Sequence, residues 1–222
     1  IEQKEKDINT ANFNFLRAQI NPHFLYNTLF SIKCTVSAGQ SEQACQMISI
    51  LISLLRNSIS TDQRTASLLS ETNLITKYVK LQNLRYQNTI ILKIESPTEL
   101  MELTMPRFLL QPLVENSIMH GIAEIPYIQE CNVSISALRE EGDVVFTVED
   151  DGMGMTEDQL KALLCADSSD SHGYGVKNID SRLKLSYGDA YGLTYRSVVG
   201  HGTAVTIRIP AMTPEEMERH VQ

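Results

Sequence analysis

The hydrophobic positions in residues 1 to about 60 recur with the period of an α-helix. With Ile8 taken as position a of a heptad, every a and d position as far as Val36 is apolar or proline. These residues are Ile8, Ala11, Phe15, Ala18, Pro22, Leu25, Leu29, Ile32 and Val36. The pattern predicts one helix of about 30 residues, roughly 45 Å long at about 1.5 Å per residue.

The same helix carries a second apolar stripe, formed by Phe13, Leu16, Ile20 and Phe24. A helix with two apolar faces belongs in a bundle. Gly39 is expected to end it, and a shorter helix follows. The apolar positions of that second helix are Ala44, Met47, Ile48, Leu51, Leu54 and Leu55. A helical hairpin with a surplus apolar face predicts a homodimer that forms a four-helix bundle.

Pro22 lies inside this predicted helix, directly before His23. Proline in a helix interior removes a backbone hydrogen bond and costs about 3 kcal/mol. It would leave the carbonyl of Ala18 without its usual donor and bend the helix. We therefore interpret Pro22 as a hinge that exposes or hides His23.

From about Ser70 the pattern mixes helical periodicity with the alternation typical of strands. The order of elements predicts an α+β sandwich, with helices on one face of a mainly antiparallel sheet. The predicted helices are 70–84, Met105–Gly121, Glu157–Leu164 and Val176–Tyr187, and the predicted strands are Thr89–Glu95, 131–138, 143–150, 193–198 and 203–209. We expect a helical hairpin in residues 1–66, the sandwich in 67–212 and a tail in 213–222.

Composition narrows the possible partners. The 222 residues are 42% hydrophobic, enough to bury a core, and carry a net charge of −8, which argues against direct nucleic-acid binding. The four cysteines are widely spaced without a C-x-x-C pair, so no disulfide framework or zinc site is expected. The sequence starts at Ile1 rather than methionine, and we expect a fragment whose full-length protein has an upstream membrane segment.

Three glycine pairs in the second half point to a nucleotide. They are Gly152 and Gly154 after Asp150, then Gly173 and Gly175, then Gly200 and Gly202 before Thr203. Glycine allows backbone N–H groups to approach a phosphate closely. No G-x-x-x-x-G-K-[ST] motif is present, and Glu157 occupies the place of the third Rossmann glycine, so those two nucleotide folds are excluded.

Glu115 and Asn116 stand together in an otherwise apolar helical segment that ends at His120. A carboxylate and an amide on a mostly buried face are costly unless they have partners. Carboxylate and amide oxygens are suitable ligands for Mg²⁺, which usually keeps several waters and shares substrate phosphates. Together with the glycine pairs, these residues indicate a nucleotide and metal site.

Five segments together resemble the sensor histidine kinases of the LytS/YesM type. They are QINPHFLYNTL, LQPLVENSIMHG, EDDGMGM, GYGVKNIDSRL and GHGTAVTIRIP. In that family a dimeric phosphoacceptor hairpin precedes an ATPase domain of the Bergerat (GHKL) fold, which is shared with gyrase, Hsp90 and MutL. The resemblance extends from about Leu16 to Pro210.

The resemblance implies roles for individual residues. His23 is the phosphoacceptor, with Glu115 a candidate for accepting its proton and Asn27 a candidate for holding the imidazole tautomer. Asn116 coordinates the Mg²⁺ that bridges the ATP phosphates, and Asp150 accepts a hydrogen bond from the adenine amino group. The remaining implied nucleotide-binding residues are His120, Gly152, Gly154, Gly173, Gly175, Gly202 and Thr203.

Two positions depart from the family pattern. Met119 stands where relatives commonly have lysine, which removes a positive charge near the phosphates. Asp151 follows the adenine-binding aspartate where relatives often have asparagine, so an extra negative charge is expected near the nucleotide.

The implied function is that of the kinase core of a two-component sensor. It would transfer phosphate from ATP, with Mg²⁺, to His23 and then to an aspartate of a response regulator receiver domain. The implied location is the cytoplasmic part of a bacterial inner-membrane protein. Two alternatives stay open: a protein serine kinase or ATP-driven clamp with the same ATPase fold, and a non-catalytic dimeric scaffold that binds nucleotide.

Overall fold

The computed structural model describes residues 22–59, 65–86, 89–122, 130–165, 174–212 and 216. The chain divides into two compact units, one of residues 1–63 and 80–87 and the other of residues 64–79 and 88–222. Helix α4 (Leu68–Tyr86) therefore contributes its first part to the second unit and its last part to the first. The predicted boundaries at 66 and 212 stay predictions.

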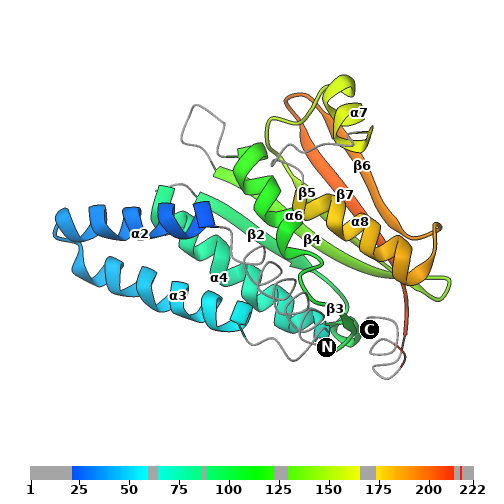
Figure 1. The fold of residues 1–222 in the computed structure, drawn as a ribbon, viewed down its shortest axis with the longest axis horizontal. Helices are drawn as coiled ribbons and strands as arrows, with labels where there is room; N and C mark the ends of the chain where they lie inside the picture. Colours follow the sequence, from blue (N-terminus) through cyan, green and yellow to red (C-terminus); the bar gives the residue numbers. More distant parts are fainter. Residues whose placement is uncertain are drawn as a thin grey trace, which may run out of the picture. The chain divides into compact units, whose positions relative to one another are not determined.

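The first unit contains a helical hairpin of α2 (Pro22–Ser37) and α3 (Ser41–Ile59) (Figure 1). Gly39 has φ +76°, a left-handed conformation that favours glycine. The N–H of Gly39 donates to the Val36 carbonyl at 2.9 Å, and that of Gln40 donates to the Thr35 carbonyl at 3.1 Å. This Schellman motif confirms the predicted helix end.

The hairpin buries only part of the apolar surface that the heptad pattern predicts for α2. Ile32, at a d position, is 7% exposed, whereas Leu29 and Val36, at a positions, are 49% and 54% exposed. Thr28, which follows neither apolar series, is fully buried. The heptad thus describes one face that packs within the chain and a second face that is left open.

The predicted hinge falls at the edge of what the structure describes. Helix α2 is described from Pro22 onward, and Ala18 lies outside the described residues, as do Phe13, Leu16 and Ile20 of the second stripe. The role of Pro22 as a hinge stays a prediction.

The second unit is built on a five-stranded sheet with strand order β2-β4-β5-β7-β6. Strand β2 runs parallel to β4, and the other neighbours are antiparallel. The strands are β2 (Thr89–Glu95), β4 (Glu130–Glu140), β5 (Asp143–Asp150), β6 (Gly192–Val198) and β7 (Gly202–Pro210). Glu141 and Gly142, with φ +47° and +95°, form the two-residue turn between β4 and β5. The predicted hairpin is confirmed.

Helices cover one face of this sheet. Ile135, Phe146 and Ile207 point to that face and are at most 1% exposed. Helix α8 (Tyr174–Tyr187) contacts β6 and β7, and a π-helical segment, η1 (Ser117–Ile122), contacts β5 and β7. Figure 1 shows α6 (Gln111–Asn116) and α8 crossing the same face. Two short helices, α5 (Thr98–Met101) and α7 (Glu157–Cys165), complete the unit. The predicted α+β class is confirmed.

The prediction of one helix from Met105 to Gly121 was wrong in its first part. Strand β3 (Thr104–Pro106) pairs with β1 (Thr65–Ser67) instead, and the chain turns before α6. Pro106 disfavours helix in the residue before it, and Phe108 adopts φ +55° in the turn. Pro112 lies in the first turn of α6, where a missing N–H is tolerated.

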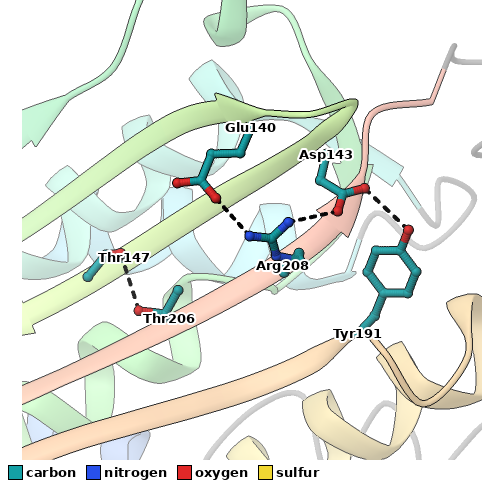
Figure 2. A network of polar contacts seen from close by, with 6 residues as sticks. All are labelled: Glu140, Asp143, Thr147, Tyr191, Thr206 and Arg208. Atoms are coloured by element: carbon teal, nitrogen blue, oxygen red, sulfur yellow. Dashed lines mark hydrogen bonds and ion pairs between the residues drawn. The ribbon is translucent and has the colours of Figure 1, made fainter.

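The opposite end of the sheet from Asp150 carries a polar network (Figure 2). The guanidinium of Arg208 donates to Asp143 at 3.0 Å and to Glu140 at 2.7 Å, and the Tyr191 hydroxyl donates to Asp143 at 3.2 Å. These contacts join β7 to both strands of the β4–β5 hairpin and to the start of β6. The network therefore stabilises the end of the sheet that lies opposite Asp150.

Helix α4 places a buried carboxylate against the start of α6. Glu71 is 3% exposed, and its Oε1 accepts the N–H of Leu110 at 2.7 Å and that of Gln111 at 3.2 Å. Burial raises the pKa of Glu71 from 4.5 to about 7, although the backbone hydrogen bonds and the charge of Arg182 oppose that shift. Desolvation of the charged form therefore outweighs those opposing interactions.

This pKa predicts that the free energy of unfolding falls as pH rises from 4.5 to about 7. Over that range the folded protein holds a proton on Glu71 that the unfolded chain has lost, so raising the pH favours unfolding. The contribution is up to about 3 kcal/mol. Urea unfolding measured between pH 5 and pH 8 should show this fall in the free energy of unfolding in wild type and not in Glu71→Gln. An exposed control, Glu99→Gln, should keep the wild-type slope, and a slope unchanged in Glu71→Gln would contradict the assignment.

Candidate nucleotide-binding site

The site is organised around the carboxylate of Asp150, the last residue of β5. Asp150 is 4% exposed, and its Oδ1 accepts the N–H of Gly152 at 3.0 Å and that of Thr203 at 3.3 Å. The hydroxyl of Ser117, in η1, also hydrogen-bonds to this carboxylate. Three segments that are far apart in the sequence therefore meet at one side chain.

Burial is the main influence on the pKa of Asp150 and raises it above its ordinary value. The hydrogen bonds from Ser117, Gly152 and Thr203 lower the pKa, while the nearby charge of Asp151 raises it further. A buried carboxylate surrounded by donors is a strong, fixed acceptor for a further N–H group. This property fits recognition of an amino group on a ligand.

Glycines are required around Asp150 because backbone segments approach one another too closely for a Cβ atom. A Cβ at Gly202 would lie 1.8 Å from the Asp150 carbonyl oxygen, and one at Gly154 would lie 2.0 Å from that of Val198. A Cβ at Gly152 would lie 2.3 Å from the carbonyl oxygen of Gly121. The structure therefore explains these glycines by protein packing, and their predicted contact with a nucleotide stays a prediction.

Hydrogen bonds connect the loop after β5, which carries Gly152 and Gly154, to η1 and to the turn before β7. The N–H of Met153 donates to the Gly121 carbonyl at 2.9 Å, and that of Gly200 donates to the Met153 carbonyl at 2.7 Å. The Ser197 hydroxyl lies 2.8 Å from that of Thr203 and accepts the N–H of Met155, also at 2.8 Å. The loop after β5 is thus fixed on both sides.

Asp151, the second departure from the family pattern, is hydrogen-bonded to strand β4, and its proximity to the nucleotide stays a prediction. Its Oδ1 accepts the backbone N–H of Asn132 at 2.7 Å, and its Oδ2 accepts the side-chain amide of the same residue at 2.7 Å. Both carboxylate oxygens are therefore engaged with β4. Asp151 fastens the loop to the sheet, and its charge reaches Asp150 only as a through-space effect on the pKa.

Glu115 and Asn116 end helix α6 and are both half-buried. The Oε1 of Glu115 accepts the side-chain amide of Gln111 at 2.8 Å, one helical turn earlier. Desolvation raises the pKa of Glu115, and this hydrogen bond opposes the rise. Burial therefore makes the carboxylate of Glu115 easier to protonate than that of an exposed glutamate.

The structure brings together only part of the predicted set. Asp150, Gly152, Gly154, Gly202 and Thr203 form one cluster. Glu115 and Asn116 lie on α6, which continues directly into η1, and the backbone of His120 lies in η1.

The other predicted residues are less completely placed. His23 and Asn27 belong to α2 of the first unit, with Asn27 half-buried. The backbone of Gly175 lies in α8, and Gly173 lies outside the described residues, as do the side chains of His23 and His120.

Sequence reasoning missed three residues that build the cluster: Ser117, Gly121 and Ser197. A Cβ at Gly121 would lie 2.8 Å from Oδ1 of Asp150, so this glycine allows η1 to approach the carboxylate. Ser117 directly follows Asn116 and Gly121 directly follows His120, so their positions next to predicted site residues could have indicated them. Gly121 was instead interpreted only as a helix end. Ser197 gave no signal, because a serine in an edge strand is ordinary.

The described part of the chain lacks two features, a cluster of metal-binding side chains and a membrane-spanning helix. No group of three or more histidine, cysteine, aspartate or glutamate side chains gathers there in a way that could hold a metal ion. Among the described helices, none combines the length and hydrophobicity needed to cross a bilayer.

The fold and the buried aspartate define an ATPase domain of the gyrase and Hsp90 class. Residues 103–213 match the family described as "Histidine kinase-, DNA gyrase B-, and HSP90-like ATPase", and residues 11–90 match the family described as "Histidine kinase". The match over residues 103–213 covers half of the chain, so the chain belongs to this ATPase family. Together with the match to "Histidine kinase", this confirms the predicted resemblance to sensor histidine kinases.

Relatives and a solved structure agree with this placement. The chain is 35% identical to the sensor histidine kinase YesM of Bacillus subtilis over 94% of its length, and 30% identical to the sensor histidine kinase BtsS of Escherichia coli, also over 94%. It spans only 35% of the length of each. The histidine kinase domain of a blue-light activated kinase from Erythrobacter litoralis shares the fold, with TM-score 0.50, 16% identity and 84% of each chain covered.

Proposed function

We propose that the chain is the kinase core of a two-component sensor that phosphorylates itself on His23 and passes the phosphoryl group to an aspartate of a response regulator. Residues 1–66 would form the dimeric phosphoacceptor module and residues 67–212 the ATP-binding module, followed by the tail. The observation that carries this proposal is the buried carboxylate of Asp150, which meets η1, the loop after β5 and the start of β7.

Asp150 would recognise adenine. Its carboxylate accepts two backbone N–H groups and one hydroxyl group, so it is held in a fixed orientation. The exocyclic amino group of adenine supplies the further donor that such an acceptor favours. Gly152, Gly154, Gly202 and Thr203 would shape the wall of the pocket, and Gly173, Gly175 and His120 would lie toward the phosphates.

The phosphate end would be held by α6. Asn116 offers an amide oxygen beside the carboxylate of Glu115, which are the oxygen ligands that Mg²⁺ accepts. When bound, Mg²⁺ would neutralise charge on the phosphates. One or two protein ligands are enough, because Mg²⁺ at such sites takes further ligands from phosphates and water. Asn116 fits this role with Glu115 beside it.

His23 would act as the nucleophile. A neutral imidazole nitrogen attacks the γ-phosphorus of ATP, the bond from phosphorus to the bridging oxygen breaks, and ADP leaves with the electron pair. The imidazole N–H proton passes to a carboxylate, a role that we propose for Glu115. Asn27 would hold the imidazole tautomer. The labile P–N bond then makes phosphohistidine a donor to the regulator's aspartate.

The exposed side of the hairpin supports a homodimer. Tyr26, Leu29 and Phe30 on α2 are 72%, 49% and 64% exposed, and Ile48 and Ile52 on α3 are 42% and 52% exposed. Apolar side chains gathered in this way on a helical hairpin are typical of an interface that a second copy covers. Each of these side chains that becomes fully buried in a dimer would contribute up to about 1.5–3 kcal/mol.

Introducing charge on this side should separate the dimer. The double variant Leu29→Glu with Phe30→Glu is expected to raise the dimer dissociation constant by at least about 100-fold, since it removes apolar burial from both copies. Sedimentation equilibrium measures the change. Leu185→Glu, at a side chain that is 88% exposed on α8, is the control and should leave the constant unchanged. Equal constants for the double variant and wild type would contradict the interface.

We propose further that the chain is the cytoplasmic part of a longer, membrane-anchored sensor. The support is that the chain spans 35% of the length of relatives that are themselves sensor kinases. A response regulator is the partner expected for proteins of this class.

The test of the function is phosphoryl transfer from γ-labelled ATP with Mg²⁺. Wild type should acquire label, whereas His23→Gln should acquire none and Asn116→Ala less than about one hundredth of the wild-type rate. His220→Gln, in the C-terminal tail, is the matched control and should keep the wild-type rate. Undiminished label in His23→Gln would overturn the proposal in favour of a serine kinase, and ATP binding without any label would favour the scaffold.

A further inference from the structure

Helix α6 and the following η1 form one continuous segment that is fixed at both ends. At its start, the carboxylate of Glu71 on α4 accepts the N–H groups of Leu110 and Gln111 at 2.7 and 3.2 Å. At its end, the Gly121 carbonyl accepts the N–H of Met153 at 2.9 Å. Asn116 lies between these two attachments.

Glu71 provides the hydrogen-bond acceptor that the sequence of α6 itself lacks at the start of the helix. Leu110, at the N-cap, has no side-chain acceptor for the free amides of the first turn. Pro112 has no N–H, and the N–H groups of Leu113 and Val114 both donate to the Leu110 carbonyl at 3.1 Å. The amides of Leu110 and Gln111 therefore depend on Glu71 for their acceptor.

The turn that leads into α6 is also held by a side chain of helix α8. Arg182 on α8 donates to the Arg107 carbonyl at 3.1 Å, and its charge acts favourably on Glu71. Between these contacts Phe108 adopts φ +55°, a conformation that costs a bulky residue energy. Hydrogen bonds from Glu71 on one helix and Arg182 on another thus hold a turn that contains a strained residue.

We propose that Glu71 is a positioning residue for the phosphate end of the nucleotide site, setting the place of Asn116 through the start of α6. Asn116 lies about 7 Å from Gln111 along the helix axis, at about 1.5 Å per residue. A shift at the start of so short a helix is passed on to Asn116 almost undiminished. The following segment is held separately, by the hydrogen bond of Ser117 to Asp150 and by that of Met153 to Gly121, so the surroundings of Asp150 should move less than Asn116.

This proposal rests on the proposed function. It predicts different effects of Glu71 on two quantities, the gain in nucleotide affinity due to Mg²⁺ and the nucleotide affinity without Mg²⁺. Loss of Glu71 should weaken the contribution that Mg²⁺ makes to nucleotide affinity, because that contribution depends on Asn116. It should leave nucleotide affinity without Mg²⁺ unchanged, because that affinity depends on Asp150. A residue that only stabilises the fold would weaken both parts together.

The experiment measures binding of a non-hydrolysable ATP analogue by calorimetry, with Mg²⁺ and with EDTA. In Glu71→Ala the gain in affinity due to Mg²⁺ should fall about 10-fold, while affinity in EDTA stays within about two-fold of wild type. In Glu71→Gln, where an amide oxygen can still accept both N–H groups, most of the gain should return. Glu99→Ala, which removes an exposed first-turn acid from α5, is the matched control. It should behave as wild type.

Hydrogen exchange supplies a readout independent of the ligand. The amides of Leu110 and Gln111 should exchange faster in Glu71→Ala than in wild type, and that of Met153 should not. If Glu71→Ala does not fold, Glu71→Asp replaces it, since a shorter side chain cannot reach both amides in the same geometry.

Equal losses of affinity with and without Mg²⁺, or no loss in either condition, would overturn the positioning role while leaving the proposed function standing. No analogue binding by the wild-type chain would overturn both.

Discussion

Replacing Asp150 by asparagine is expected to weaken ATP binding by at least about 100-fold while the protein stays folded. A hydrogen bond to a charged acceptor contributes about 1.5–3 kcal/mol, and the new amide group would turn a donor toward the adenine amino group. About 1.4 kcal/mol corresponds to a factor of ten in affinity. The fold should tolerate the change, because an asparagine oxygen can still accept the N–H groups of Gly152 and Thr203. Calorimetry with ATP and thermal unfolding measure the two effects separately.

The neighbouring residue provides the control for this prediction. Asp151→Asn removes the same charge at the next position, but both Asp151 oxygens are bonded to Asn132 on β4. Its ATP affinity should stay within about three-fold of wild type, since only a screened through-space interaction is lost. Equal affinities for Asp150→Asn and wild type would remove Asp150 from the binding site.

Gly202→Ala is expected to have the largest effect on stability, lowering the free energy of unfolding by more than about 3 kcal/mol. Gly202 has φ +91°, and a Cβ there would lie 1.8 Å from the carbonyl oxygen of Asp150. The atom in the way belongs to the backbone of β5, so no side-chain rotation can relieve the overlap. Separating β7 from β5 at this point would also pull Thr203 away from Asp150.

Gly200→Ala separates the effect of crowding from that of backbone conformation. Gly200 lies in the same turn with φ +78°, but a Cβ there would meet no atom within 4 Å. Its cost should be about 1 kcal/mol, the penalty for an ordinary residue in the left-handed region. Urea unfolding of both variants gives the comparison. Equal destabilisation by the two substitutions would show that packing against Asp150 is not the reason for Gly202.

The elements that the sequence predicted correctly are those whose signal is local. Strand β2, the β4–β5 hairpin and α7 each combine a clear period with turn residues at their ends, and the structure has them where the pattern places them. The segment from Met105 to Gly121 was misread, because its apolar residues also fit a helix. Its pairing of β3 with β1, nearly forty residues earlier, is a non-local contact that no local period reveals.

The site was predictable in its residues but less so in its physical basis. Asp150 and the glycines stood out because acid and glycine together are uncommon at a strand end. Their reason in the structure is mutual backbone packing, which depends on segments that meet only in the folded chain. The partners of Asp151 and Glu71 lie on other strands and helices, at Asn132 and at Leu110 and Gln111. Spacing along the chain carries no information on such pairs.

The proposed function depends on transfer of the γ-phosphoryl group of ATP to His23. The most direct measurement is to incubate the wild-type chain with ATP and Mg²⁺, digest it under alkaline conditions and locate the phosphoryl group by mass spectrometry. We expect a phosphoryl group on the peptide that contains His23, stable in alkali and lost in acid. An acid-stable group on serine or threonine, or no phosphoryl group on a chain that binds ATP, would contradict it.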